Sequence, residues 1–193
     1  RERAAQMPLI FQEGFTEKLV AAVKAGELDV VILALPLAEP GLVAQPVYDE
    51  AFRALAPAQH PWRKTRAIEP VALLDEPLLL LGAGNCFRDQ VLDLCAQAKH
   101  PPDAAQIIEG SSLETIRYMV ASGLGVSVMP SSCADLIPKN DALLCSRPFV
   151  EPAPTRCVGL VWRTSFPRHK AIDLLRCALL DCRLPGTRPV RKK

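Results

Sequence analysis

Residues 8–35 read PLIFQEGFTEKLVAAVKAGELDVVILAL. Residues 8–12 have the composition of a strand, and apolar residues then recur at helical spacing over 15–23. Gly26 is placed to end that helix. Residues 30–35 follow as an unbroken apolar strand, which is typical of burial on both faces. Strand, helix and strand in this order form a βαβ unit, which predicts an α/β fold with parallel strands and right-handed crossovers.

The alternation of short strands and amphipathic helices continues to the end of the chain. A helix is predicted to begin at a capping box formed by Ser111 and Glu114 and to stop at Gly123. Residues 51–57 are predicted to be extended, and no linker of the kind found between domains accompanies them. This is expected of a strand that crosses between two lobes. The remaining predicted strands are 42–47, 78–81, 107–108, 125–129 and 157–162, and the remaining predicted helices are 70–74, 86–98 and 167–180.

Length and charge restrict the function of the chain. The 193 residues suffice for one domain or for two small lobes sharing a hinge, and 49% of them are hydrophobic. No apolar run approaches the roughly 20 residues of a membrane span, and the N-terminus lacks a signal region, so we expect a soluble, cytoplasmic protein without a membrane partner. The net charge is +2, and most of the excess positive charge lies in residues 188–193, which we interpret as a solvated tail. A basic face with a reading helix is not apparent, so this chain alone is a poor DNA binder.

The cysteines are the most informative residue type. There are seven, an odd number, which excludes a complete disulfide framework. The chain has neither a Cys-x-x-Cys motif nor a Cys/His cluster at zinc spacing, so we expect no metal and no cofactor. In a reducing compartment most of these thiols should be free and should behave as small core hydrophobes.

Cys86 and Cys95 enclose a decapeptide, CFRDQVLDLC, whose pattern predicts a helix. Nine helical steps rise about 13.5 Å and turn about 900°, which places the two side chains on opposite faces. A disulfide requires Cα atoms closer than about 7 Å. The two thiols therefore cannot bond while the helix exists, and any bond between them requires this segment to refold. This conflict predicts a redox switch.

The chain resembles the OxyR group of LysR-type transcriptional regulators, whose members sense hydrogen peroxide. The resemblance rests on GNCFRDQ at residues 84–90 with a second cysteine at position 95, followed by SLETIRYMVASG at residues 112–123. Its specific part is the Cys-x-Arg-Asp-Gln run at 86–90 with that second cysteine. The less specific part is EGFT at 13–16, GELDVVILAL at 26–35 and residues 119–130, which fit many LysR-type effector domains. The resemblance extends over nearly the whole chain.

This resemblance implies two Rossmann-like lobes of the periplasmic-binding-protein type, joined by crossover strands. Lobe I would comprise residues 1–49 and 160–193, and lobe II, with the redox cysteines, residues 50–159. Residues 1–6 resemble the end of the first helix of lobe I, so we expect the first strand of the family to be missing. The resemblance also implies a homodimer through this domain and a tetramer in the full-length protein. DNA would bind only through an N-terminal domain absent here, and a glutaredoxin or thioredoxin system would be the reductant.

The same resemblance assigns roles to individual residues. Cys86 is the candidate peroxidatic cysteine, because a thiol at a helix start near a cation ionises readily. Peroxide would oxidise it to sulfenic acid, and Cys95 would then resolve this to a disulfide. Arg88 would stabilise the thiolate, while the Thr16 hydroxyl and Asn85 would bind peroxide. Asn85 stands where well-known members carry histidine, and helix capping also accounts for it.

The main reading is therefore a peroxide-responsive regulatory domain, not an enzyme, in which the Cys86–Cys95 bond alters the DNA-bound oligomer. An alternative is a small-molecule effector domain of another LysR-type regulator, with inert cysteines. A thiol peroxidase is a third reading, which sustained turnover would distinguish from a sensor. The other cysteines are interpreted as structural: Cys133, Cys145, Cys157, Cys177 and Cys182.

Overall fold

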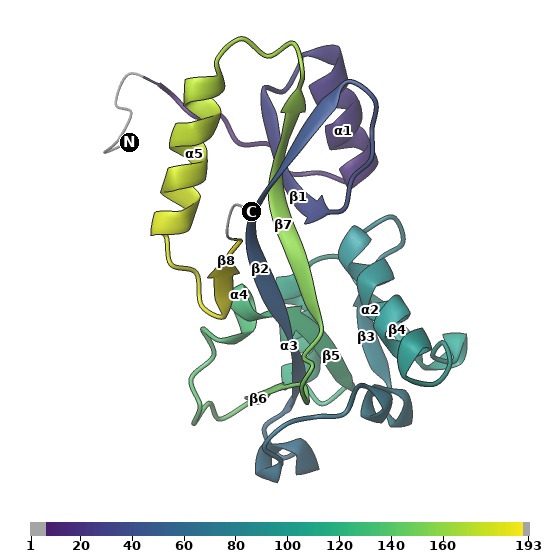
Figure 1. Ribbon diagram of the computed structural model, residues 1–193. Coiled ribbons are helices and arrows are strands. Elements are labelled where there is room, and N and C mark those ends of the chain that lie inside the picture. The colour runs from purple at the N-terminus through teal and green to yellow at the C-terminus, as the bar shows by residue number, and fades with distance from the viewer. Residues whose placement is uncertain (1–6, 191–193) are drawn as a thin grey trace. The chain divides into compact units, whose positions relative to one another are not determined.

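The computed structural model describes residues 7–190 (Figure 1). The chain divides into two compact units: unit 1 comprises residues 1–49 and 156–193, and unit 2 comprises residues 50–155. The expectation for residues 1–6 lies outside the described part of the chain. Strand β2 (Leu42–Pro57) begins in unit 1 and ends in unit 2, so the two strands predicted at 42–47 and 51–57 form one continuous strand.

Unit 1 contains α1 (Thr16–Ala25), β1 (Val30–Leu35), α5 (His169–Asp181) and β8 (Thr187–Pro189), together with most of β7 (Thr155–Arg163). In its sheet, β7 lies between β1 and β2, and β8 also pairs with β2. Two apolar clusters hold this unit together. Residues Val20, Val23, Val31, Leu33 and Val161 form the first, and Val47, Leu160, Trp162, Phe166 and Ile172 form the second.

Three predictions for the first 35 residues are wrong. The described structure contains no strand at residues 8–12, and Ile10 is 94% exposed, because an apolar segment becomes a strand only where a neighbouring edge pairs with it. The pairing of β1 with β7 is antiparallel, so this segment does not complete a parallel βαβ unit. Burial along β1 alternates, with Val31 and Leu33 buried and Ile32 42% exposed, so the strand is not buried on both faces along its length.

Unit 2 contains the parallel βαβ arrangement. Strand β3 (Leu78–Leu81) pairs in parallel with β4 (Ile107–Gly110) and with β5 (Val126–Pro130). Helix α2 (Cys86–Ala98) connects β3 to β4, and α3 (Leu113–Ala121) connects β4 to β5 (Figure 1). The second half of β2 pairs antiparallel with β5 and with β6 (Leu144–Pro148). The shorter elements are η1 (Pro61–Lys64), η2 (Pro70–Asp75), η3 (Ala104–Gln106) and α4 (Ser131–Ala134).

The core of unit 2 lies between β3 and the helices. All four residues of β3 are buried, and Phe87, Val91 and Cys95 of α2 pack into the same cluster. The α/β class is thereby confirmed, with parallel pairing of β3 with both β4 and β5. The predicted capping box at α3 is wrong by one residue, because Ser112 caps the helix and Glu114 pairs with Arg117 instead.

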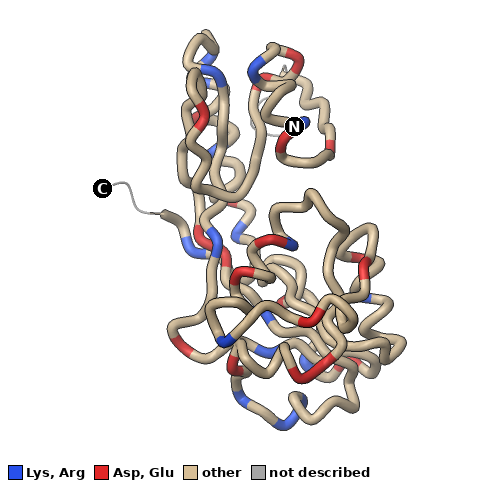
Figure 2. The backbone as a smooth tube through the Cα atoms, turned by 90° about the vertical axis from the view of Figure 1, so that its right-hand side faces the viewer, with Lys and Arg blue, Asp and Glu red and all other residues tan. Residues whose placement is uncertain are grey.

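Charged residues of both signs are interspersed in both units, as Figure 2 shows. This mixture agrees with the small net charge of +2. Among the helices of residues 7–190, none combines the length and the apolar composition needed to cross a bilayer.

Candidate functional site

Helix α2 begins at Cys86 because the preceding residues provide a turn and a cap. Gly84 adopts a positive φ of 84°, which turns the chain after β3. Asn85 has extended backbone angles, and its side-chain Oδ1 accepts a hydrogen bond from the Phe87 N–H at 3.0 Å. This is an N-cap, which satisfies one of the free N–H groups at the helix start. Cys86 is therefore the first helical residue, and it is half-buried.

The apolar stripe of α2 holds the helix on the sheet. Phe87 is buried, and its ring meets the Phe52 ring of β2 edge to face, with centroids 5.2 Å apart. Val91, one turn further along, is buried in the same cluster. The first turn of α2 is thus attached to the core immediately beside Cys86, which keeps the decapeptide helical.

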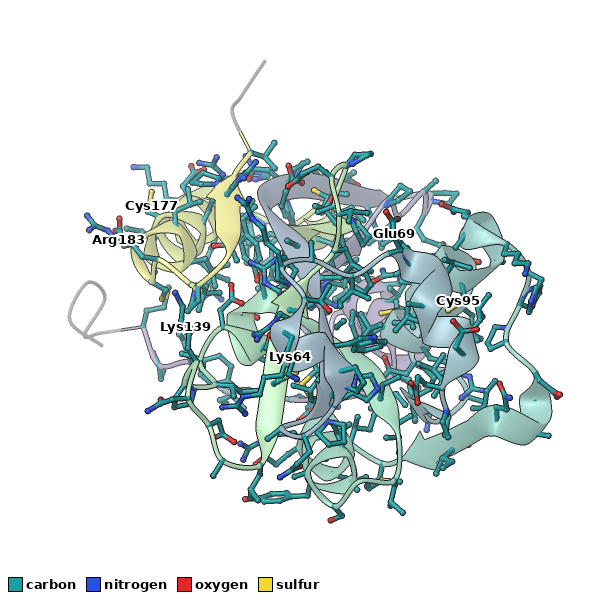
Figure 3. The ribbon with its side chains drawn as sticks, turned by 90° about the horizontal axis from the view of Figure 1, so that it is seen from below. Lys64, Glu69, Cys95, Lys139, Cys177 and Arg183 are labelled. Atoms are coloured by element: carbon teal, nitrogen blue, oxygen red, sulfur yellow. The ribbon has the colours of Figure 1, made fainter. Side chains whose placement is uncertain are left out.

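Cys95, labelled in Figure 3, lies on the same buried stripe of α2 and belongs to the cluster that includes Leu73 of η2. Its side chain is 0% exposed, and burial raises the pKa of its thiol to about 11. Burial raises a thiol pKa because the apolar surroundings disfavour the charged thiolate. At neutral pH this thiol is protonated and is a poor nucleophile while the helix is intact.

Cys86 and Cys95 are both free thiols at the two ends of one continuous helical segment. The predicted helix at 86–98 is confirmed with the same bounds. Nine residues of α-helix separate Cα atoms by about 13.5 Å, well beyond the roughly 7 Å that a disulfide tolerates. A bond between these two thiols therefore requires α2 to unwind.

Arg88 lies in the first turn of α2, two residues after Cys86, with its guanidinium directed to the sheet. Its Nη1 donates to the Leu81 carbonyl at 2.8 Å, and the same nitrogen is 2.8 Å from Glu109 Oε1. These contacts attach the helix start to the ends of β3 and β4. Sequence reasoning missed Glu109, because it lies 21 residues from Arg88 and only the parallel pairing of β3 with β4 brings the two together.

Thr16 is the first residue of α1 in unit 1, and it is partly exposed. The other predicted site residues, Asn85, Cys86, Arg88 and Cys95, belong to unit 2. Because Thr16 and Cys86 belong to different units, a shared role for them stays a prediction.

The remaining cysteines have varied surroundings. Burial raises the pKa of the Cys145 thiol. Burial also raises the pKa of Cys157, and the neighbouring Asp49 carboxylate adds to that effect. Cys133, Cys177 and Cys182 are exposed, and Figure 3 labels Cys177 on α5. Within residues 7–190, no group of three His, Cys, Asp or Glu side chains is arranged to hold a metal ion.

The raised pKa of Cys95 predicts a pH dependence of stability. Between about pH 9 and pH 11 the unfolded chain loses the proton that the folded chain keeps, so the free energy of unfolding should fall as pH rises, by roughly 2 kcal/mol at most. Below about pH 9 both states hold the proton and this contribution is constant. Urea unfolding in excess reductant at about pH 8 and about pH 10.5 measures the effect.

Two variants isolate the contribution of this thiol. Cys95→Ala should show a smaller loss of stability between the two pH values than the parent chain. Cys133→Ala, which removes an exposed thiol, should keep the parent's loss. Equal losses in all three proteins would contradict the assignment of this pH dependence to Cys95.

The family follows from comparison with known proteins. The model of the LysR substrate binding domain matches residues 1–181, so the chain belongs to the LysR substrate-binding-domain family. Within that family it is similar to OxyR regulatory domains. The reduced OxyR regulatory domain of Pseudomonas aeruginosa is 44% identical with a TM-score of 0.84, covering 100% of this chain and 87% of that one. Reduced OxyR of N. meningitidis is 38% identical with a TM-score of 0.86, covering 99% and 88%.

Curated relatives agree with these structures. A probable hydrogen peroxide-inducible genes activator of Mycobacterium avium is 38% identical over 86% of this chain and 53% of the relative. The DNA-binding transcriptional dual regulator OxyR of Escherichia coli is 32% identical over 90% of this chain and 56% of the relative. The chain thus spans about half the length of these relatives. The family and the matched structures confirm the predicted fold class, the periplasmic-binding-protein type.

Proposed function

We propose that this chain is the peroxide-responsive regulatory domain of an OxyR-type transcription factor, in which a Cys86–Cys95 disulfide is the signal. One observation carries the proposal: a single helix holds a half-exposed thiol at its start and a fully buried thiol nine residues later. The similarity to OxyR regulatory domains supports it. Control of transcription belongs to the longer protein, and DNA would be bound by a segment outside this chain.

The first chemical step takes place at Cys86. Cys86 is the first residue of α2, where the helix leaves backbone N–H groups free to donate hydrogen bonds to an anionic sulfur. The thiolate sulfur attacks one oxygen of hydrogen peroxide, an S–O bond forms and the O–O bond breaks. Hydroxide leaves and takes a proton to become water. The product is Cys86 sulfenic acid.

The second step joins the two cysteines. Once α2 unwinds, Cys95 leaves the core, its thiol ionises more readily, and its sulfur attacks the sulfenic sulfur of Cys86. An S–S bond forms, the S–O bond breaks, and the hydroxide that leaves is protonated to a second water. Together the two thiols supply two electrons and reduce one peroxide to two waters. A glutaredoxin or thioredoxin system would return the thiols.

The other predicted site residues support these steps. Asn85 keeps Cys86 at the helix start through its cap, and together with Thr16 it would hydrogen-bond peroxide. Arg88 would bring positive charge to the first turn and stabilise the Cys86 thiolate. The refolded segment would repack the homodimer interface of this domain and so alter the tetramer of the full-length protein.

A peroxide titration with mapping of cysteine oxidation tests the proposal. With one equivalent of hydrogen peroxide or less, we expect peptides joined by a Cys86–Cys95 bond, with the other five cysteines still reduced. Peroxide consumption should stop near one equivalent per chain without a reductant, and sustained consumption with a thiol reductant would indicate a peroxidase instead. Rapid oxidation at other cysteines with Cys86 untouched would contradict the proposal and favour a metabolite-binding effector domain.

A further inference from the structure

We propose that Glu109 is a positioning residue for the redox switch: through Arg88 it holds the first turn of α2 in the reduced conformation and so sets how readily the disulfide forms. This inference rests on the proposed Cys86–Cys95 chemistry. It concerns a residue outside the decapeptide, on a neighbouring strand.

The sheet places Glu109 beside the start of α2. In the parallel pairing of β3 with β4, Glu109 lies opposite Leu80, and Gly110 lies opposite Leu81. Both strands end here, and α2 follows β3 after a short turn. The Glu109 carboxylate lies over this turn, because a Cβ built on Gly82 would be 3.9 Å from Glu109 Oε2.

Arg88 connects this carboxylate to the helix. Its Nη1 contacts two acceptors at 2.8 Å each, the Leu81 carbonyl in β3 and Glu109 Oε1 in β4. The Arg88 side chain is 15% exposed, so its charge is largely removed from water, and Glu109 is the carboxylate that compensates it.

Disulfide formation must break this contact. Arg88 lies between Cys86 and Cys95, in the segment that has to unwind, whereas Leu81 and Glu109 belong to paired strands of the sheet. The contact therefore stabilises the reduced form and not the oxidised form. An opposing feature lies in the same segment, where the buried Gln90 Oε1 lacks a hydrogen-bond partner within the described structure, a cost that unwinding would remove.

Loss of the Glu109 charge should change the equilibrium constant for disulfide formation only a few-fold, because the Glu109 side chain is 52% exposed and water screens the pair. Glu109→Gln keeps the shape of the side chain and removes its charge. In a dithiothreitol redox buffer at low salt, the equilibrium constant for the Cys86–Cys95 disulfide should rise about two- to five-fold over the parent chain. Glu109→Asp keeps the charge on a shorter side chain, so its equilibrium constant should lie between those of the parent chain and Glu109→Gln.

A matched control is available on the next helix. Glu114→Gln removes the carboxylate of the Glu114–Arg117 pair, which is also exposed and joins two residues of α3. It should leave the disulfide equilibrium at the parent value. Salt near 1 M should reduce the Glu109→Gln difference, since screening weakens the pair in the parent chain.

Each outcome is decisive. An unchanged disulfide equilibrium in Glu109→Gln, or an equal shift in Glu114→Gln, would overturn the role of Glu109 and leave the proposed function intact. A parent chain that forms no Cys86–Cys95 bond in the same buffer would instead overturn the proposed function, and the role of Glu109 with it.

Discussion

Cys86→Ser should lose the peroxide-induced disulfide completely. A serine hydroxyl at the start of α2 cannot supply the thiolate that attacks peroxide, and the buried Cys95 is protonated at neutral pH, with a pKa raised to about 11. The rate of peroxide consumption should fall to that of the remaining, unactivated thiols. Mass spectrometry of peptides after about one equivalent of peroxide measures both the bond and any oxidation elsewhere.

Two further variants separate the steps. Cys95→Ser should stop at the sulfenic acid, which a dimedone adduct on Cys86 would detect. Cys145→Ser, a change at a buried thiol outside the pair, should still form the Cys86–Cys95 bond. A Cys86→Ser chain that forms a different disulfide through Cys95 at the same peroxide dose would show that another cysteine is the primary target.

Gly125→Ala should strongly destabilise unit 2. Gly125 precedes β5 with a φ of +153°, and a Cβ built there would lie 2.2 Å from the Pro77 carbonyl oxygen. That oxygen accepts the Val126 N–H at 2.9 Å, so the new methyl group would push β5 away from the residue that leads into β3. We expect the free energy of unfolding to fall by about 2–4 kcal/mol, measured by urea unfolding of the reduced chain.

Gly123→Ala provides the comparison for this second change. Gly123 has a φ of +81°, but nothing lies within 4 Å of a Cβ built there. The free energy of unfolding of Gly123→Ala should fall by only about 1 kcal/mol, which is the cost of placing alanine in the left-handed conformation. If Gly125→Ala and Gly123→Ala lost the same amount, the close approach of Pro77 would not be a determinant of stability.

The candidate site was largely predictable where its determinants are local. The helix at 86–98 was predicted with its observed bounds, since capping and apolar spacing act within a few residues. The geometric conflict between Cys86 and Cys95 needs only helical rise and the reach of a disulfide. The all-leucine strand β3 was likewise predicted at residues 78–81 and observed there.

Predictions failed where a residue's state depends on distant partners. Residues 8–12 have the composition of a strand, yet the described structure offers them no pairing edge. The prediction that β1 pairs in parallel was wrong, because its antiparallel partner β7 lies more than a hundred residues away in the sequence. At α3, two adjacent serines both fit a cap, and only the backbone conformation selects Ser112.

Helix α2 shows which features depend on local sequence and which depend on tertiary packing. Local sequence determined that Cys86 begins a helix and that Cys95 cannot reach it, because hydrogen bonds and side-chain spacing within one helix involve only near neighbours. Tertiary packing alone buries Cys95 and pairs Arg88 with Glu109, since both depend on which strands and helices meet across the core.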